Sequence, residues 1–130
     1  MRKLILLYNF SDERAAKIRR LALPMKMGVR VVEKKDYNQP IGVILGKKDF
    51  DKIDGEYEGT GFSEEMLLMQ GLTGREIDAL IKGMNKNGVG RIALKAVVTA
   101  SNIYWDSVEV HNVVRTDHEE MMRRRRAVQK

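Results

Sequence analysis

The residues best suited to chemistry lie in one short stretch, where a predicted strand turns toward a predicted helix. Five side chains with polar or aromatic groups gather there: Lys95, Thr99, Ser101, Asn102 and Trp105. Such a turn presents hydroxyl and amide groups beside free backbone N–H groups, an arrangement that can bind small anions or polar ligands. The competing interpretation is structural, with Ser101 or Asn102 capping the helix and Trp105 packing on the core. We take these five residues as a candidate ligand-binding site.

A second concentration of charge lies in the basic tail, residues 120–130. It contains four consecutive arginines, which could bind the phosphates of a nucleic acid: Arg123, Arg124, Arg125 and Arg126. Glu119 and Glu120 lie four residues before the first two arginines, a spacing that favours ion pairs along one helix. No aromatic residue interrupts the basic run. A solvated helix end therefore competes with a nucleic-acid-binding arm.

The net charge of the protein resides in this tail. The chain has 24 basic and 18 acidic residues, a formal net charge of +6. Five of the basic residues and none of the acidic ones lie between positions 123 and 130, so residues 1–120 are close to neutral. We therefore expect little electrostatic steering of anionic partners by the body of the protein.

No motif in the sequence specifies a reaction. It has no phosphate-binding loop, no nucleophile elbow, no His-Glu zinc pattern and no dinucleotide fingerprint. His111 and His118 lie seven residues apart on one helical face, but without cysteine a metal site there would need carboxylates in an unusual geometry. We predict no catalytic residues, no metal site and no cofactor.

Composition favours the cytoplasm. Cysteine is absent, so no disulfide can form, which fits a reducing compartment. The apolar run at residues 4–7 is too short for a signal peptide, and no stretch approaches the roughly 20 apolar residues of a membrane-spanning helix. We expect a cytoplasmic protein that does not contact a membrane.

The candidate residues stand on elements that the hydrophobic pattern predicts twice. Residues 3–46 and residues 66–110 each begin with an apolar strand, continue with a capped amphipathic helix and then give a second strand after a Gly-Val pair. In the alignment of the two segments, Gly28 falls over Gly88. We interpret the segments as half-repeats of a single domain covering residues 1–130.

Local signals place the helices of both halves. Ser11 can cap the first helix, and Thr73 with Glu76 forms a capping box for its counterpart. Apolar residues then recur at helical spacing in the second half: Ile77, Leu80, Ile81 and Met84. A final helix is predicted from near Trp105 to the arginine tail.

An acidic linker, residues 49–65, joins the two halves. It contains seven acidic residues and one lysine. Three aromatic residues are spaced along it: Phe50, Tyr57 and Phe62. These side chains can attach the linker to the body of the protein.

The strand pattern predicts an α/β fold with a four-stranded sheet. The first and third strands are apolar throughout and should be central, whereas the second and fourth alternate and should lie at the edges. We favour a ferredoxin-like plait with added helices, in the antiparallel order 4-1-3-2. The alternative is a small parallel sheet of order 2-1-3-4, for which the region between the second and third strands offers only a short crossover helix.

The second half also resembles a bacterial family called domain of unknown function 3783. Its members show a strand ending in Leu-Lys-Ala-Val-Leu-Thr, then Pro-Thr-Asn, a tryptophan three residues later, and a helix finishing in Glu-His. Five residues of this chain match those places: Lys95, Thr99, Asn102, Trp105 and His118. Ala100 and Ser101 stand where proline and threonine are usual, and Asp117 replaces glutamate. The resemblance covers about residues 66–119 and implies no activity.

Three functions follow as hypotheses. The first is an interaction or regulatory module without catalytic activity, which binds a protein partner or a second copy of itself. An alternative is a nucleic-acid-associated protein that uses the arginine tail. The other alternative is a small polar-ligand-binding or enzymatic site at the end of the fourth strand.

Overall fold

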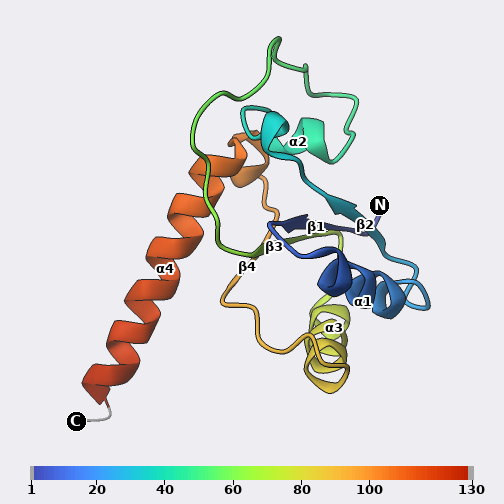
Figure 1. The fold of residues 1–130 in the computed structure, drawn as a ribbon, viewed down its shortest axis with the longest axis vertical. Coiled ribbons are helices and arrows are strands. Elements are labelled where there is room, and N and C mark those ends of the chain that lie inside the picture. Colours follow the sequence, from blue (N-terminus) through green and yellow to red (C-terminus); the bar gives the residue numbers. More distant parts are fainter. Residues whose placement is uncertain (1, 129–130) are drawn as a thin grey trace.

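The computed structural model describes residues 2–128 and shows an α/β fold in three layers (Figure 1). The elements in chain order are β1 (Leu4–Tyr8), α1 (Asp12–Ala22), β2 (Gly28–Val31), the 3₁₀ helix η1 (Lys34–Asp36), α2 (Ile41–Ile44), β3 (Met66–Gln70), α3 (Gly74–Lys86), β4 (Leu94–Val97), the 3₁₀ helix η2 (Asn102–Tyr104) and α4 (Ser107–Val128). None of these helices is both long and apolar enough to cross a membrane.

The four strands form a mixed sheet of order β2-β1-β3-β4. The pairs β1–β2 and β3–β4 are parallel, and the central pair β1–β3 is antiparallel. The predicted α/β class is confirmed, and so is the central position of the two apolar strands. The preferred plait is wrong. The alternative had the right strand order and the right direction for the two outer pairs, but its central pair is antiparallel instead of parallel.

The physical reason for this correction lies in the connections. Each half closes its own strand-helix-strand unit, in which α1 or α3 supplies the crossover that a parallel pair needs. Because β3 runs antiparallel to β2, the C-terminus of β2 and the N-terminus of β3 lie at the same end of the strands. The linker between them therefore needs no crossover helix.

The register of the central pair is symmetric about Leu6 and Leu68, which face each other. These two residues also correspond in the alignment of the predicted half-repeats, so the pairing is the one that a two-fold axis between equivalent halves requires. The outer strands keep this equivalence, because Gly28 lies opposite Leu4 and Leu94 lies opposite Met66, so the structural counterpart of Gly28 is Leu94. Gly88 lies after α3 with φ of +82°, so its alignment with Gly28 is wrong.

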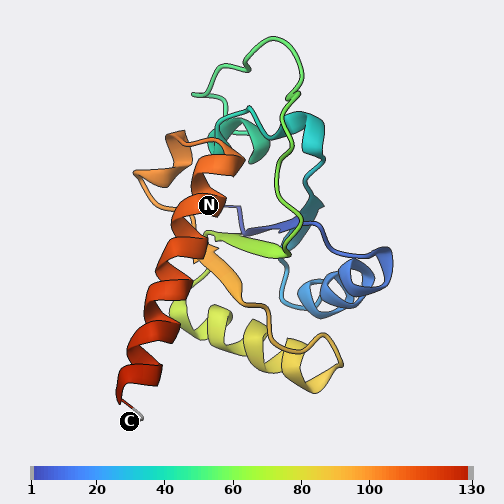
Figure 2. The ribbon, with the colours of Figure 1, turned by 60° about the vertical axis from the view of Figure 1, so that its left-hand side comes forward.

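Two apolar cores, one on each face of the sheet, explain why β1 and β3 are buried along their whole length. Alternate residues of a strand point to opposite faces, so Ile5 and Leu7 enter one core and Leu6 enters the other. α1 and α3 cover the first face, and α2, the linker and the first half of α4 cover the second (Figure 2). A strand covered on both faces must be apolar throughout.

The predicted N-terminal caps of α1 and α3 are confirmed. The Ser11 hydroxyl accepts a hydrogen bond from the backbone N–H of Arg14 at 3.2 Å. Thr73 and Glu76 bond reciprocally at the start of α3. The final helix begins near Trp105, as predicted, and is capped by the reciprocal bonds of Asp106 and Glu109, which the sequence analysis did not identify.

The acidic linker packs against the second face through its aromatic residues. Phe62 stacks on Tyr37 with ring centroids 5.0 Å apart and on His111 at 3.9 Å. Near the other end of the linker, the Phe50 ring lies against Gly42 of α2, where a Cβ atom would be only 2.5 Å from the ring. The linker is therefore part of the second core.

A buried hydroxyl pair joins β1 to α4 within this core. The Tyr8 Oη and Ser107 Oγ atoms are 2.8 Å apart, and neither residue is exposed to solvent. Burial raises the pKa of Tyr8 well above its usual range, because the phenolate would lose its hydration.

We expect the Leu68→Ala variant to lose about 2–5 kcal/mol of unfolding free energy, because Leu68 is 1% exposed at the centre of the sheet and truncation leaves a cavity. Urea denaturation measures this change. Val97→Ala is the control, since Val97 is 42% exposed on the edge strand. Equal losses in the two variants would contradict the central placement of β3.

The Tyr8 hydroxyl should make the protein less stable in alkali. Its folded pKa lies above the unfolded value of about 10, so its contribution to stability is complete below pH 10 and is lost as the pH rises further. Denaturant unfolding between pH 8 and pH 11 should show this decline. The Tyr8→Phe variant should decline less steeply, and an unchanged slope would contradict the assignment.

Candidate functional site

The turn after β4 is built from the polar residues that the sequence analysis selected. Asn102 Oδ1 accepts from the Thr99 backbone N–H at 2.7 Å, and Asn102 Nδ2 donates to the carbonyl of Val97 at 3.1 Å. Thr99 Oγ1 accepts from the backbone N–H groups of Asn102 and Ser101, at 3.0 and 3.3 Å. The side chains of Thr99 and Asn102 thus bind the turn's own backbone.

The other two predicted ligand-binding residues direct their side chains away from this turn network. Lys95 is on β4, where its ammonium group donates to the carbonyl of Ile92. Trp105 packs against the second core, and its carbonyl accepts from the backbone N–H of Ile41 at 2.8 Å. The structure therefore brings together Thr99, Ser101 and Asn102, but it does not add Lys95 or Trp105 to them.

Lys95 instead contributes to a groove between β4 and α4, with a volume of about 190 Å³. Apolar and ionisable side chains line this groove: Ala93, Lys95, Ala96, Val114, Asp117, His118 and Met121. Burial, with a smaller contribution from the nearby charge of Arg91, lowers the pKa of Lys95. The α4–β4 groove thus combines apolar side chains with a partly buried ammonium group.

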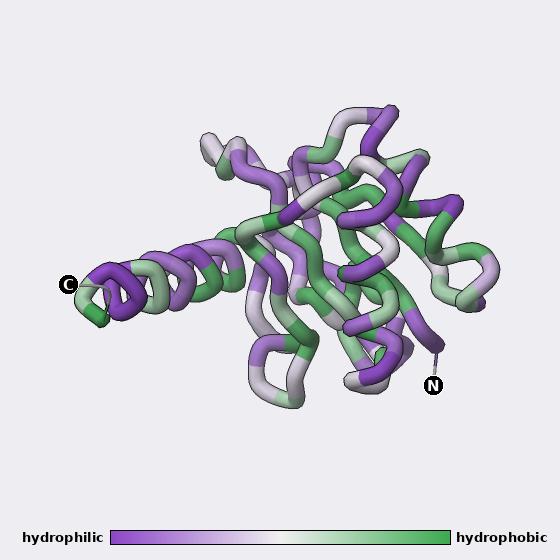
Figure 3. Tube along the Cα trace, turned by 90° about the horizontal axis from the view of Figure 1, so that it is seen from below, coloured by the Kyte–Doolittle hydropathy of each residue, from purple (hydrophilic) through white to green (hydrophobic). Residues whose placement is uncertain are grey.

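The helical side of this groove continues along α4 beyond the sheet. Val114, Asp117 and Met121 share one face of the helix, and Val128 follows on the same face seven residues after Met121. The buried residues of α4 all lie in its first turns, namely Ser107, Val110 and His111. Figure 3 shows the C-terminal part of α4 projecting from the body of the protein. Met121 is 45% exposed and Val128 is 86% exposed.

The arginines lie on this projecting half of α4. Glu120 forms ion pairs with Arg123 and Arg124, the latter at 3.4 Å. Of the two pairs predicted from the four-residue spacing, Glu120–Arg124 is present, whereas Glu119 pairs with Arg115 at 4.0 Å. These ion pairs offset part of the basic charge. Residues 129 and 130 of the predicted tail lie outside the described part of the chain.

The two histidines enter different surroundings. His111 is buried, stacks on Phe62 and places Nε2 2.8 Å from Glu64 Oε1. His118 lines the α4–β4 groove. Between residues 2 and 128 the structure shows no group of three His, Asp or Glu side chains that could hold a metal ion.

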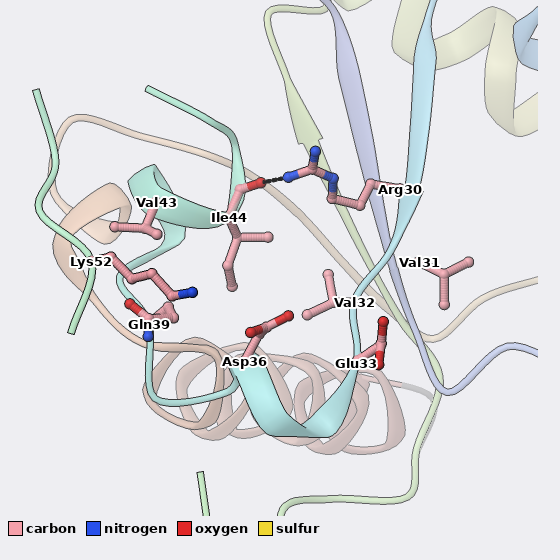
Figure 4. Close-up of a pocket in the computed structure, with 9 residues that line it drawn as sticks. All are labelled: Arg30, Val31, Val32, Glu33, Asp36, Gln39, Val43, Ile44 and Lys52. Atoms are coloured by element: carbon pink, nitrogen blue, oxygen red, sulfur yellow. Dashed lines mark hydrogen bonds between the residues drawn. The ribbon is translucent and has the colours of Figure 1, made fainter. Parts of the chain in front are cut away.

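A larger cavity, of about 370 Å³, lies between β2 and α2. The sequence analysis missed it, because its residues follow no motif and meet only when α2 folds beside the edge strand. Figure 4 shows Lys52 and Asp36 directed toward it, while Arg30 donates to the carbonyl of Ile44. Two basic and two acidic side chains line it, namely Arg30, Lys52, Glu33 and Asp36, so it has no net charge that would select an anion or a cation.

Comparison with known families found a match in the second half. Residues 65–121 match the family described as Domain of unknown function (DUF3783), which confirms the resemblance seen in the sequence. No curated protein and no solved structure matches the chain. The matched segment contains every residue that lines the α4–β4 groove, whereas the cavity beside β2 is formed entirely outside it.

The hydrogen bonds of the turn predict a structural role for Asn102. We expect Asn102→Ala to lower the unfolding free energy by about 1–3 kcal/mol, because the Thr99 N–H and the Val97 carbonyl both lose their partner. Ser101→Ala should cost less, because Ser101 joins this network through its backbone. Thermal or urea unfolding of both variants tests this, and a neutral Asn102→Ala would leave the side chain free for a ligand.

Proposed function

We propose that the protein is an interaction module without catalytic activity. Its binding surface is the outer half of α4, residues 115–128, together with the α4–β4 groove. The observation that carries this proposal is the exposed apolar face of a helix that has left the body of the protein. Met121 lines the groove but stays 45% exposed, and Val128 on the same face is 86% exposed.

Helix physics supports a partner for this segment. Fourteen residues make about 21 Å of helix, and an isolated helix of that length is marginal in water. Helices in proteins gain most of their stability from packing an apolar face. Residues 115–128 obtain little of this from their own chain, since the buried positions of α4 end at His111. A protein that packs against Met121 and Val128 would supply it.

The alternatives receive less support from the geometry. The hydroxyl of Thr99 and the amide of Asn102 are engaged within their own turn, and the ammonium group of Lys95 is bonded to a carbonyl. For nucleic acid, Glu120 competes with phosphate for two of the arginines. An interaction role uses the exposed apolar residues, which the other two functions leave unexplained.

The proposal predicts that binding depends on Met121. We expect a tagged chain to capture at least one protein from extracts of the source organism, and Met121→Lys to reduce that capture at least tenfold, because a charge replaces the centre of the apolar face. Quantitative mass spectrometry, followed by reconstitution with the purified partner, measures the effect.

Leu23→Lys is the matched control, since Leu23 is 78% exposed at the end of α1, away from α4. Capture that does not depend on Met121 would contradict the proposed surface. Ribonuclease and salt treatment of the extract would show whether the arginines instead hold a nucleic acid, in which case binding should fall steeply with salt.

A further inference from the structure

We infer that α4 binds α4 of a second copy of this chain, with the two helices antiparallel about a two-fold axis at Met121. This inference rests on the proposed function, and it names the partner and its orientation. Three features of the helix support it: the order of its charges, the spacing of its apolar residues and the position of the groove.

The charges of the outer half are arranged in two blocks. After Arg115, which pairs with Glu119 of its own helix, come three acidic residues, namely Asp117, Glu119 and Glu120. Met121 and Met122 separate them from the four arginines of residues 123–126. Two such helices packed antiparallel place the acidic block of each beside the basic block of the other. A parallel pair would place arginines beside arginines. The helix is thus complementary to a second copy of itself in one orientation only.

The apolar residues have the same symmetry. Val114, Met121 and Val128 recur at seven-residue intervals and therefore lie on one face of α4. In an antiparallel pair centred on Met121, the two Met121 side chains meet, and Val114 of each copy faces Val128 of the other. Asp117 of one copy then lies beside Arg124 and Arg125 of the second. A two-fold interface requires this kind of self-complementary surface.

The groove accepts the end of the second helix. Val114 packs against the second core and lines the groove from the helix side, and the small side chains of Ala93 and Ala96 line it from the sheet side. The Val128 side chain of the second copy arrives at this position. The α4–β4 groove thus receives an apolar side chain at each end of the pair, and the exposed Val128 becomes covered.

The interface should be weak, because an overlap of about 21 Å of helix is small beside interfaces that bury 1,200–2,000 Å² in total. The ion pairs of Glu120 with Arg123 and Arg124 within each helix further reduce what these charges contribute between copies. We expect a dimer with a dissociation constant on the order of micromolar that dissociates further in high salt.

Disulfide cross-linking tests the orientation, because the natural chain contains no cysteine. Under mild oxidation, Met121→Cys should form a disulfide-linked dimer, since the two thiols meet at the axis. Val128→Cys alone should not, but a mixture of Val114→Cys and Val128→Cys chains should form a mixed dimer. Circular dichroism of each variant verifies that it is folded. Efficient linkage of Val128→Cys to itself would show a parallel pair and overturn the inference.

Sedimentation equilibrium over about 1–500 µM tests the energetics. Met121→Lys should weaken the dimer at least tenfold, and Leu23→Lys should not. Asp117→Arg and Arg124→Asp should each weaken it, and the two changes combined in one chain should restore part of the loss, because the opposite charges again lie side by side.

A chain that stays monomeric over this range and forms no Met121→Cys dimer would overturn the second copy as partner. The proposed function would then still stand if capture of a different protein depended on Met121. It would fall as well if neither assay responded to that residue.

Discussion

The antiparallel pairing of β1 with β3 is the constraint on which the rest of the structure depends. Both strands are buried along their whole length, and Leu6 faces Leu68 at the centre. Because β1 and β3 pair with each other along their inner edges, each strand pairs with its parallel neighbour, β2 or β4, along its outer edge. The helices must then cover both faces, since neither side of an apolar strand tolerates water.

Besides α2, the second face of the sheet packs against the linker and the start of α4. A stack of three rings, Tyr37, Phe62 and His111, connects the first half, the linker and the helix. The Tyr8–Ser107 hydroxyl pair adds a polar tie from the central strand to the same helix. These contacts fix the inner turns of α4, and a rigid inner end sets the direction in which the outer half leaves the body.

The parts of this fold that depend on neighbouring residues were predictable from the sequence. A capping box needs only Thr73 and Glu76, and an uninterrupted apolar strand predicts that both of its faces are covered. Strand direction was not predictable, because the hydrophobic pattern of β1 and β3 is the same in parallel and antiparallel sheets. The packing of β4 against α4, and of β2 against α2, likewise has no local signal in the sequence, because the packed elements are not neighbours along the chain.

The candidate turn shows a different limit of sequence reasoning. The residue types at Thr99 and Asn102 suit a ligand and suit a turn equally well, because the same oxygen and nitrogen atoms serve both. In the folded protein these atoms bond to the backbone of their own segment. By contrast, the apolar spacing along α4 was visible in the sequence, but its exposure depends on where the sheet ends.

The reversal of direction at the middle of the sheet has a consequence for ligand binding. In doubly wound α/β proteins, loops that follow adjacent parallel strands meet in one crevice at their carboxyl ends, and ligands bind there. Here the loops after Tyr8 and Val31 leave the sheet at one end of the strands, and those after Gln70 and Val97 leave it at the opposite end. The carboxyl ends of β1 and β3 therefore cannot form one shared crevice, and each of the two hollows belongs to one half: the cavity is lined by residues 30–52 and the groove by residues 93–121.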